Sequence, residues 1–164
     1  MKSRILSFIL SLIAWLILTW SVDWQHLLIG LLASIFVSWA VGDLFTENPW
    51  KFKDPKRYLW AVYYIIILIW EMIKANLDVA YRVVHPGIPI KPGIVKVRTK
   101  LKSDAALTYL ANSITLTPGT FTIDIDKENG FLYIHWINVV SEDIDKATEV
   151  IVQKFERILE KIFE

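Results

Sequence analysis

The first part of the chain consists of long apolar runs separated by short polar breaks. Residues 5–22 carry no charge, and Asp23 is the only charged residue between Ile5 and Val41. Apolar runs of this length are close to the minimum for a helix that crosses a bilayer. We therefore expect helices over about 5–22 and 24–42, joined by a tight turn into a membrane hairpin. The second helix carries three small residues: Gly30, Ala33 and Ser34. They either allow close packing against a neighbouring helix or are incidental on a helix that faces lipid.

A third apolar run starts at Tyr58, after a polar loop over residues 43–57. Asp54 and Pro55 are typical of the residue before a helix and of its first turn. We expect a helix over about 56–84, which at roughly 1.5 Å per residue is longer than a hydrocarbon core of about 30 Å. One of its ends should therefore project into water or into a partner.

The sequence leaves the sidedness of these segments open. If the third helix crosses the bilayer, the basic loop and the tail lie on opposite faces, and both faces are rich in Lys and Arg. If it only dips into the bilayer, all basic segments lie on the cytoplasmic side. We expect a cytoplasmic tail because six basic residues follow close to the membrane exit: Arg82, Lys91, Lys96, Arg98, Lys100 and Lys102.

Residues 85–93 separate two differently patterned parts of the chain. Three prolines and two glycines in these nine residues exclude a helix and favour an extended connector. We expect a membrane domain over residues 1–84 and a soluble domain over residues 94–164.

The soluble part has the periodicities of a small α+β fold. Alternating positions predict strands over 94–100, 121–126 and 131–137, and Asn129-Gly130 is typical of a hairpin turn. Helices should follow the first and third strands; Ser103 or Asp104 can cap the first of them, and Ser141 can cap the second. The first two strands should run parallel through a right-handed crossover, with the helices on one face of the sheet.

The predicted fold class is therefore a membrane α-helical protein, a hairpin plus a third hydrophobic helix, with a small C-terminal α+β domain in the order β-α-β-β-α. Composition agrees, because 54% of the residues are hydrophobic and six of the eight tryptophans lie at or before Trp60, as interfacial rings would. The net charge of +1 gives no support for nucleic-acid binding. Without cysteine, the chain has no disulfide, thiolate metal site or catalytic thiol.

Little in the sequence points to catalysis. It contains no glycine-rich phosphate loop and no nucleophile elbow. Three histidines lie in separate segments, so we predict a structural role for each: His26, His85 and His135. Three acidic residues near the hairpin turn lack the spacing of a calcium loop: Asp124, Asp126 and Glu128. We predict no catalytic residue, no metal site and no cofactor.

A charged stripe on the third helix is the best candidate for a functional site. Its residues are spaced three, four and four apart, which stacks alternating acids and bases on one helix face: Glu71, Lys74, Asp78 and Arg82. Ionisable groups at membrane depth cost several kcal/mol unless paired, and they often mark a proton path. The stripe either neutralises itself and docks onto a partner subunit, or relays protons through Glu71 or Asp78.

Three segments resemble the E subunit of Mrp-type multisubunit cation/proton antiporters, the MrpE/MnhE family. They are residues 74–79 (KANLDV), 90–94 (IKPGI) and, most specifically, 110–120 (LANSITLTPGT). The order of hairpin, third hydrophobic helix and tail also matches, so the resemblance covers essentially the whole chain. It implies structural roles for eight motif positions: Asn76, Pro92, Gly93, Asn112, Thr117, Pro118, Gly119 and Thr120.

The same family also occurs as a module of membrane-bound hydrogenases and related respiratory complexes of anaerobic archaea. The resemblance implies a non-catalytic, multi-pass subunit of the cell membrane that supports assembly and Na+/H+ exchange. Its partners would be the lipid bilayer and the other subunits of an antiporter or hydrogenase-type complex. Two alternatives stay open: a direct part in ion relay, and a membrane anchor for a separate soluble partner.

Overall fold

The computed structural model describes residues 2–21, 23–41 and 54–164. Contacts divide the chain into two compact units, Met1–Lys53 and Asp54–Glu164. Each unit has its own packing.

The contacts of the third helix lie in the second unit, although the expected division placed this helix with the hairpin. The prediction that residues 1–84 form the membrane domain concerns contact with lipid, and it stays a prediction. The polar loop predicted over residues 43–57 lies outside the described residues up to residue 53.

In the first unit, α1 (Lys2–Thr19) and α2 (Trp24–Val41) pack antiparallel. The Trp15 indole Nε1 donates to the carbonyl oxygen of His26 at 3.0 Å, close to the turn. At the other end, the Ser38 hydroxyl donates to the carbonyl oxygen of Arg4 at 2.6 Å. The predicted first helix extended to residue 22; α1 instead ends at Thr19, and Trp20 takes the positive φ of 48° that starts the turn.

Small residues of α2 allow this close packing, which is one of the two alternatives that the sequence leaves open. A Cβ added at Gly30 would lie 2.4 Å from the nearest atom of the Trp15 ring, so no larger residue fits there without movement. Ser34, one turn further along, is 1% exposed. Most other side chains of α1 and α2 are exposed and apolar, as lipid-facing helices would be.

The second unit opens with α3 (Pro55–Val84). The Asp54 carboxylate accepts the Lys56 backbone N–H at 3.0 Å, and Pro55 occupies the first turn, where its missing N–H is not needed. The helix ends before His85, because the following Pro86 disfavours helical geometry at that position. These ends agree with the sequence prediction.

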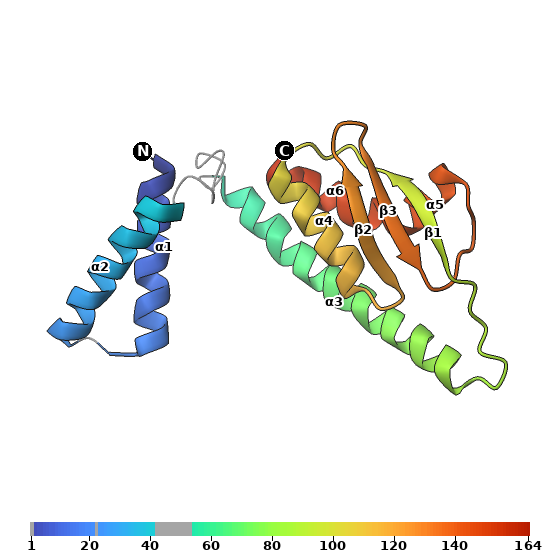
Figure 1. The fold of residues 1–164 in the computed structure, drawn as a ribbon, viewed down its shortest axis with the longest axis horizontal. Coiled ribbons are helices and arrows are strands. Elements are labelled where there is room, and N and C mark those ends of the chain that lie inside the picture. Colours follow the sequence, from blue (N-terminus) through green and yellow to red (C-terminus); the bar gives the residue numbers. More distant parts are fainter. Residues whose placement is uncertain (1, 22, 42–53) are drawn as a thin grey trace. The chain divides into compact units, whose positions relative to one another are not determined.

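A three-stranded sheet follows, built from β1 (Gly93–Arg98), β2 (Thr120–Asp126) and β3 (Phe131–Trp136) in the order β1-β3-β2. Both outer strands are antiparallel to β3, so they run in the same direction, as the predicted crossover requires. The crossover through α4 (Asp104–Leu116) nevertheless places β2 one strand away from β1, and β3 lies between them. Figure 1 shows β3 between its two neighbours, with α3 running alongside α4.

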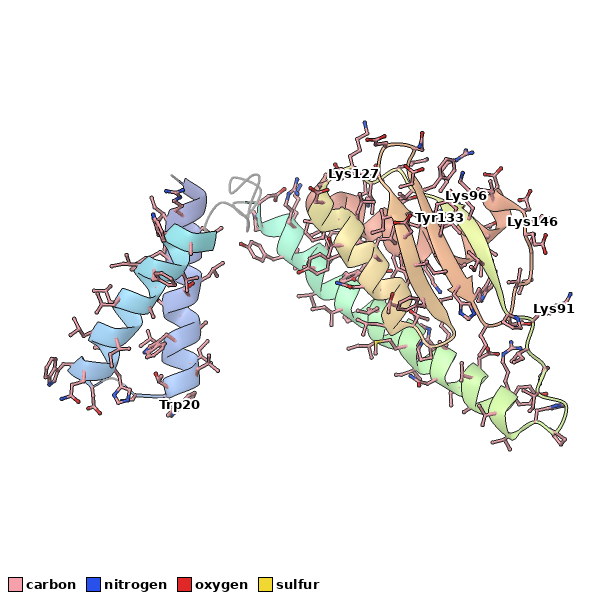
Figure 2. All side chains as sticks on the ribbon, in the orientation of Figure 1. Trp20, Lys91, Lys96, Lys127, Tyr133 and Lys146 are labelled. Carbon is pink, nitrogen blue, oxygen red and sulfur yellow. The ribbon has the colours of Figure 1, made fainter. Side chains whose placement is uncertain are left out.

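One face of the sheet holds the core of this unit. Side chains of β1 and β3 are buried there against α4, α5 and α6: Val95, Val97, Leu132 and Ile134. The opposite face is open in the second unit, and Lys96 and Tyr133 lie on it (Figure 2). The Lys96 Nζ is 3.8 Å from the centroid of the Phe131 ring. The described helices that pack on the sheet lie on its core face, as predicted.

The last helix was predicted as a single element capped by Ser141, and both points are corrected. The structure has α5 (Ile144–Ile151) and α6 (Gln153–Phe163), separated at Val152. Asp143 is the cap, because its carboxylate accepts the Lys146 backbone N–H at 3.0 Å. Ser141 lies two positions earlier and accepts the N–H of Asp143 instead.

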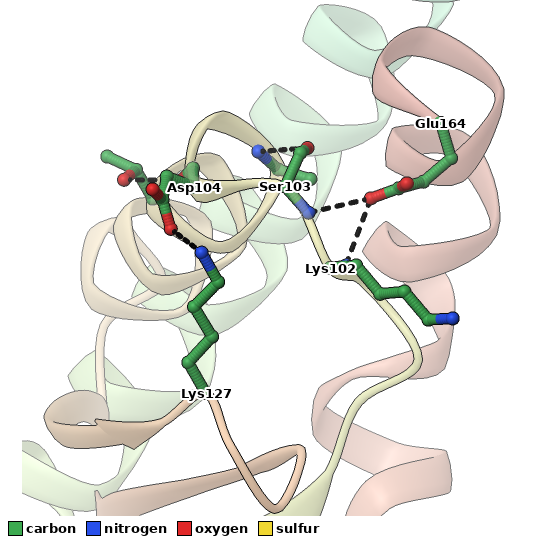
Figure 3. Close-up of polar contacts among 7 residues, drawn as sticks. Lys102, Ser103, Asp104, Lys127 and Glu164 are labelled. Atoms are coloured by element: carbon green, nitrogen blue, oxygen red, sulfur yellow. Dashed lines mark hydrogen bonds and ion pairs between the residues drawn. The ribbon is translucent and has the colours of Figure 1, made fainter. Parts of the chain in front are cut away.

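Figure 3 shows how α6 is tied to the start of α4. The Glu164 carboxylate accepts the backbone N–H groups of Lys102 and Ser103, both at 3.0 Å. The Ser103 hydroxyl caps α4 by accepting from Ala106 N, as predicted. Beside it, Asp104 pairs with Lys127 of the β-hairpin.

Candidate docking site on the third helix

One face of α3 packs onto the rest of its unit along most of the helix. The residues on this face recur every three or four positions, the spacing of a single helical stripe. They are Arg57, Trp60, Tyr64, Leu68, Glu71, Ala75 and Val79. Because the stripe contains Arg, Tyr and Glu among its apolar members, the contact with the α+β elements is partly polar.

Two polar contacts fix the first half of α3. The Arg57 guanidinium donates to the carbonyl oxygen of Ile162 near the end of α6. The Tyr64 hydroxyl is hydrogen-bonded to the Ser113 hydroxyl of α4, and Tyr64 is 7% exposed. A buried tyrosine whose hydroxyl has a partner costs little to bury and orients the helix that carries it.

Glu71 is the centre of a charged cluster at the middle of α3. Its carboxylate accepts from the Lys154 Nζ of α6 at 2.8 Å and pairs with Lys74 through the other oxygen. The Glu71 side chain is only 15% exposed. A partly buried carboxylate is expensive unless it is paired, so the two lysines hold it in its charged form and join α3 to α6.

The two remaining residues of the predicted stripe pair with each other. Arg82 donates to both carboxylate oxygens of Asp78, at 2.7 and 3.0 Å, in a fork geometry. Arg82 also donates to the carbonyl oxygen of Pro89 at 2.5 Å, which fastens the connector to the end of α3. The predicted acid–base stripe thus forms two pairs, each with a further contact inside the same chain.

The Thr117–Thr120 turn accounts for four motif positions. The Thr117 hydroxyl donates to the carbonyl oxygen of Ser113 at 2.8 Å, and the Thr120 hydroxyl donates to that of Ile114 at 2.7 Å. These bonds satisfy the last carbonyl groups of α4. Gly119 has a φ of +91°, and a Cβ there would lie 2.9 Å from Ile137 Cγ2.

Residues of α3 and residues of this turn lie around a cavity of about 140 Å³. Asp78 and Ala75 line it from α3, and Thr117, Pro118 and Thr120 line it from the turn. On the α6 side, the lining includes Lys154 and Phe155. Two motifs about forty positions apart in the sequence therefore serve one location, the junction of α3 with the α+β elements.

The other motif positions lie elsewhere. Asn76 is exposed, and its amide donates to the carbonyl oxygen of Met72 at 2.8 Å. Asn112 is exposed on α4. Pro92 and Gly93 line a second cavity, of about 300 Å³, where the connector enters β1. A Cβ at Gly93 would lie 3.0 Å from Val139 Cγ2.

Sequence reasoning missed the partners that α3 finds within the chain. Lys154 contacts Glu71 across 83 positions, and Ser113 contacts Tyr64 across 49. Lys154 precedes a core phenylalanine on an amphipathic helix, and nothing in that local pattern identifies an acidic partner so far away. The absence of charge from residue 58 to residue 70 also concealed that this stretch has a polar contact at Tyr64.

The arrangement is suited to holding elements together. In the described ranges 2–21, 23–41 and 54–164, no group of three or more His, Asp or Glu side chains could hold a metal ion. Glu71 already has two cationic partners, and Asp78 has one. A carboxylate that exchanges protons during a cycle would have to leave such partners.

Comparisons with known proteins give a consistent result. A family model described as "Na+/H+ ion antiporter subunit" matches residues 8–162. The chain is 38% identical over 133 residues to the E subunit of the Na(+)/H(+) antiporter of Alkalihalophilus pseudofirmus, which covers 80% of each chain. It is 30% identical over 168 residues to the E1 subunit of the Na(+)/H(+) antiporter of Staphylococcus saprophyticus, which covers 100% of this chain and 99% of the relative.

Among solved structures, the chain is similar to one from the membrane-bound sulfane sulfur reductase, an archaeal respiratory membrane complex. The TM-score is 0.85 at 44% identity, covering 99% of this chain and 100% of the other.

Proposed function

We propose, from the premise that this chain belongs to the family of Na+/H+ antiporter E subunits, that it is a non-catalytic subunit that stabilises a multisubunit membrane complex. One observation carries this proposal. The charged residues of α3 that a proton relay would use are paired within the chain: Glu71 with Lys154 and Lys74, and Asp78 with Arg82.

In this proposal the partners are the other subunits of an ion-translocating complex, in which exchange of Na+ and H+ takes place. A respiratory host is favoured over a free-standing antiporter. The support is the similarity to a chain of the archaeal complex, at 44% identity over almost the whole length, against 38% over 80% for the antiporter relative.

The proposed placement is multi-pass, with α1 and α2 crossing the bilayer and residues 54–164 on the cytoplasmic side. The support is the exposed apolar surface of both helices, together with the basic residues that follow α3. Their apolar stretches, Arg4–Thr19 and Trp24–Ala40, are short, so they suit a thin or locally compressed bilayer.

A direct part in proton transfer is the alternative. The observation in its favour is that the Asp78 side chain is 53% exposed beside the 140 Å³ cavity, so water can reach one carboxylate of the stripe.

The test is to express the host complex with and without this chain and to identify the subunits that remain together in mild detergent. We expect the complex to lose subunits when the chain is omitted. A complex that keeps every other subunit, yet loses ion-coupled transport, would overturn the assembly role and favour the relay.

A further inference from the structure

The face of α3 that points away from its own unit is apolar along the whole helix. Its residues again recur every three or four positions: Leu59, Val62, Ile66, Ile69, Ile73, Leu77, Ala80 and Val84. We call these eight residues the outer stripe. Its large side chains are between 48% exposed, at Ile73, and 82% exposed, at Val84. An apolar surface of this length is far larger than the patches that monomeric soluble proteins leave in water.

A membrane crossing does not explain this stripe. Contacts with the α+β elements run along the opposite face from Arg57 to Val79, which is roughly 33 Å of helix at about 1.5 Å per residue. If α3 crossed the bilayer, the packed elements would enter the hydrocarbon with it. They would bring Lys154 and the charged surface of α6, at a cost of several kcal/mol for each ionised group.

An orientation of α3 parallel to the membrane surface would place each of its two faces in a suitable environment. The packed face, from Arg57 to Val79, keeps its contacts with the α+β elements in water, and the outer stripe reaches the boundary between headgroups and acyl chains. Aromatic side chains suited to that boundary are exposed on α3: Tyr58, Tyr63, Trp70 and Tyr81.

Lipid fits the outer stripe better than a partner's transmembrane helix does. Close helix–helix contact in membranes uses small residues, as Gly30 and Ser34 do where α2 meets α1. The outer stripe has one small residue, Ala80, and otherwise presents Leu, Ile and Val at regular spacing. Such a surface offers no notch for a second helix.

We propose that α3 lies in the plane of the membrane interface, with its outer stripe in the lipid and the α+β elements on the aqueous side. The proposal rests on the proposed function only in placing residues 54–164 at a membrane. It specifies the ligand of the outer stripe as the headgroup–acyl boundary of a bilayer.

The test uses single cysteines. The chain itself contains no cysteine, so each introduced cysteine is the only one in it. Nitroxide labels are attached to Leu59→Cys, Ile66→Cys and Ile73→Cys in the whole complex, reconstituted in liposomes of phosphatidylcholine and phosphatidylglycerol. Lys146→Cys, at an exposed position of α5 labelled in Figure 2, is the aqueous control. Collisions with oxygen, which concentrates in lipid, and with a water-soluble nickel chelate then report the depth of each label.

We expect the three α3 labels to show one common, shallow depth, about 5–10 Å below the headgroups, and an oxygen-to-nickel ratio severalfold above that of the control. A depth that is greatest at Ile66 and smaller at the flanking positions would overturn the proposal in favour of a crossing helix. Labels shielded from both reagents would mean that a partner protein covers the stripe. Ratios equal to the control would mean that the stripe lies in water.

Identifying the subunits present in the same labelled complexes keeps the two proposals separate. A complex of normal composition with contradictory depths sinks the in-plane placement alone. The converse outcome is labels at the expected depth together with a complex that keeps all its other subunits when this chain is omitted. That outcome would contradict the assembly role alone.

Discussion

The two helices of the N-terminal unit and α3 are all apolar, yet their contacts within the protein differ. The contacts of α1 and α2 are with each other, and side chains such as Leu18 and Phe36 stand 83% and 65% exposed. Among the described residues, α3 alone is long and apolar enough to pass as a membrane span. It is also the helix fastened along one face to an α+β body, through Arg57, Tyr64 and Glu71.

Hydropathy alone therefore does not decide how an apolar helix lies relative to a membrane. For α1 and α2, no polar body is attached along the helix within their unit, so a crossing is available. For α3, the contacts that run from Arg57 to Val79 are the reason why we propose an in-plane placement instead. Substitutions on the two faces of α3 and in the body should therefore have very different consequences.

The largest effect is expected in the core that α3 covers. Phe155 is 1% exposed, and Phe155→Ala should lower the free energy of unfolding of the second unit by about 3–5 kcal/mol. Leu77→Ala, on the outer stripe at 68% exposure, should change it by less than about 0.5 kcal/mol. Urea titration of the detergent-solubilised chain measures both. Equal losses would show that the outer stripe is packed within the protein.

The second-largest loss of stability is expected at a buried carboxylate of α6. Glu156 is 8% exposed and accepts from the Thr99 hydroxyl at 2.6 Å and from Lys100 N at 2.7 Å. Glu156→Ala leaves both donors without this acceptor and should cost about 2 kcal/mol in the same titration. Glu160→Ala, exposed on the same helix, is the matched control and should cost almost nothing. A neutral Glu156→Ala would mean that water replaces the carboxylate.

Adjacent tyrosines of α3 separate its two faces directly. Tyr64→Phe removes the hydroxyl that bonds to Ser113 and should cost about 1 kcal/mol in unfolding free energy. Tyr63→Phe changes a side chain that is 46% exposed and should leave stability within experimental error. The reverse order of effects would place the body on the other face of α3.

The smallest effect concerns pH and a turn far from α3. The amide and backbone N–H groups of Asn129 donate to Asp126 and hold the pKa of that carboxyl below its usual value. The charged form therefore stabilises the fold above the ordinary Asp pKa of about 3.9, and this contribution is lost as pH falls through the lower folded pKa. Asp126→Asn should flatten that part of the pH–stability curve, measured by urea titration across this pH range.

Local features could be predicted from sequence because they depend on neighbouring residues. The caps at Asp54 and Ser103 and the turn at Thr117 each involve groups within a few positions. The family resemblance is confirmed, and its most specific segment is the one that ends α4 with this turn.

Long-range features could not be predicted in this way. The central place of β3 depends on pairing with β1, more than thirty positions earlier in the chain. The partner of Glu71 depends on how α6 packs. The break at Val152 has no proline or glycine to mark it, so the periodic pattern around it predicted one helix.

Transport by the assembled complex tests the central claim, that the charges of α3 hold the protein together and move no protons. The rate of ion-coupled transport per complex is measured in proteoliposomes for Glu71→Gln, Asp78→Asn and Lys154→Met. The last variant breaks the pair between α3 and α6 but keeps the Glu71 carboxylate. Assembled complexes of all three variants should transport at the wild-type rate. Loss of transport in Glu71→Gln or Asp78→Asn, with normal subunit composition and an active Lys154→Met complex, would contradict the account.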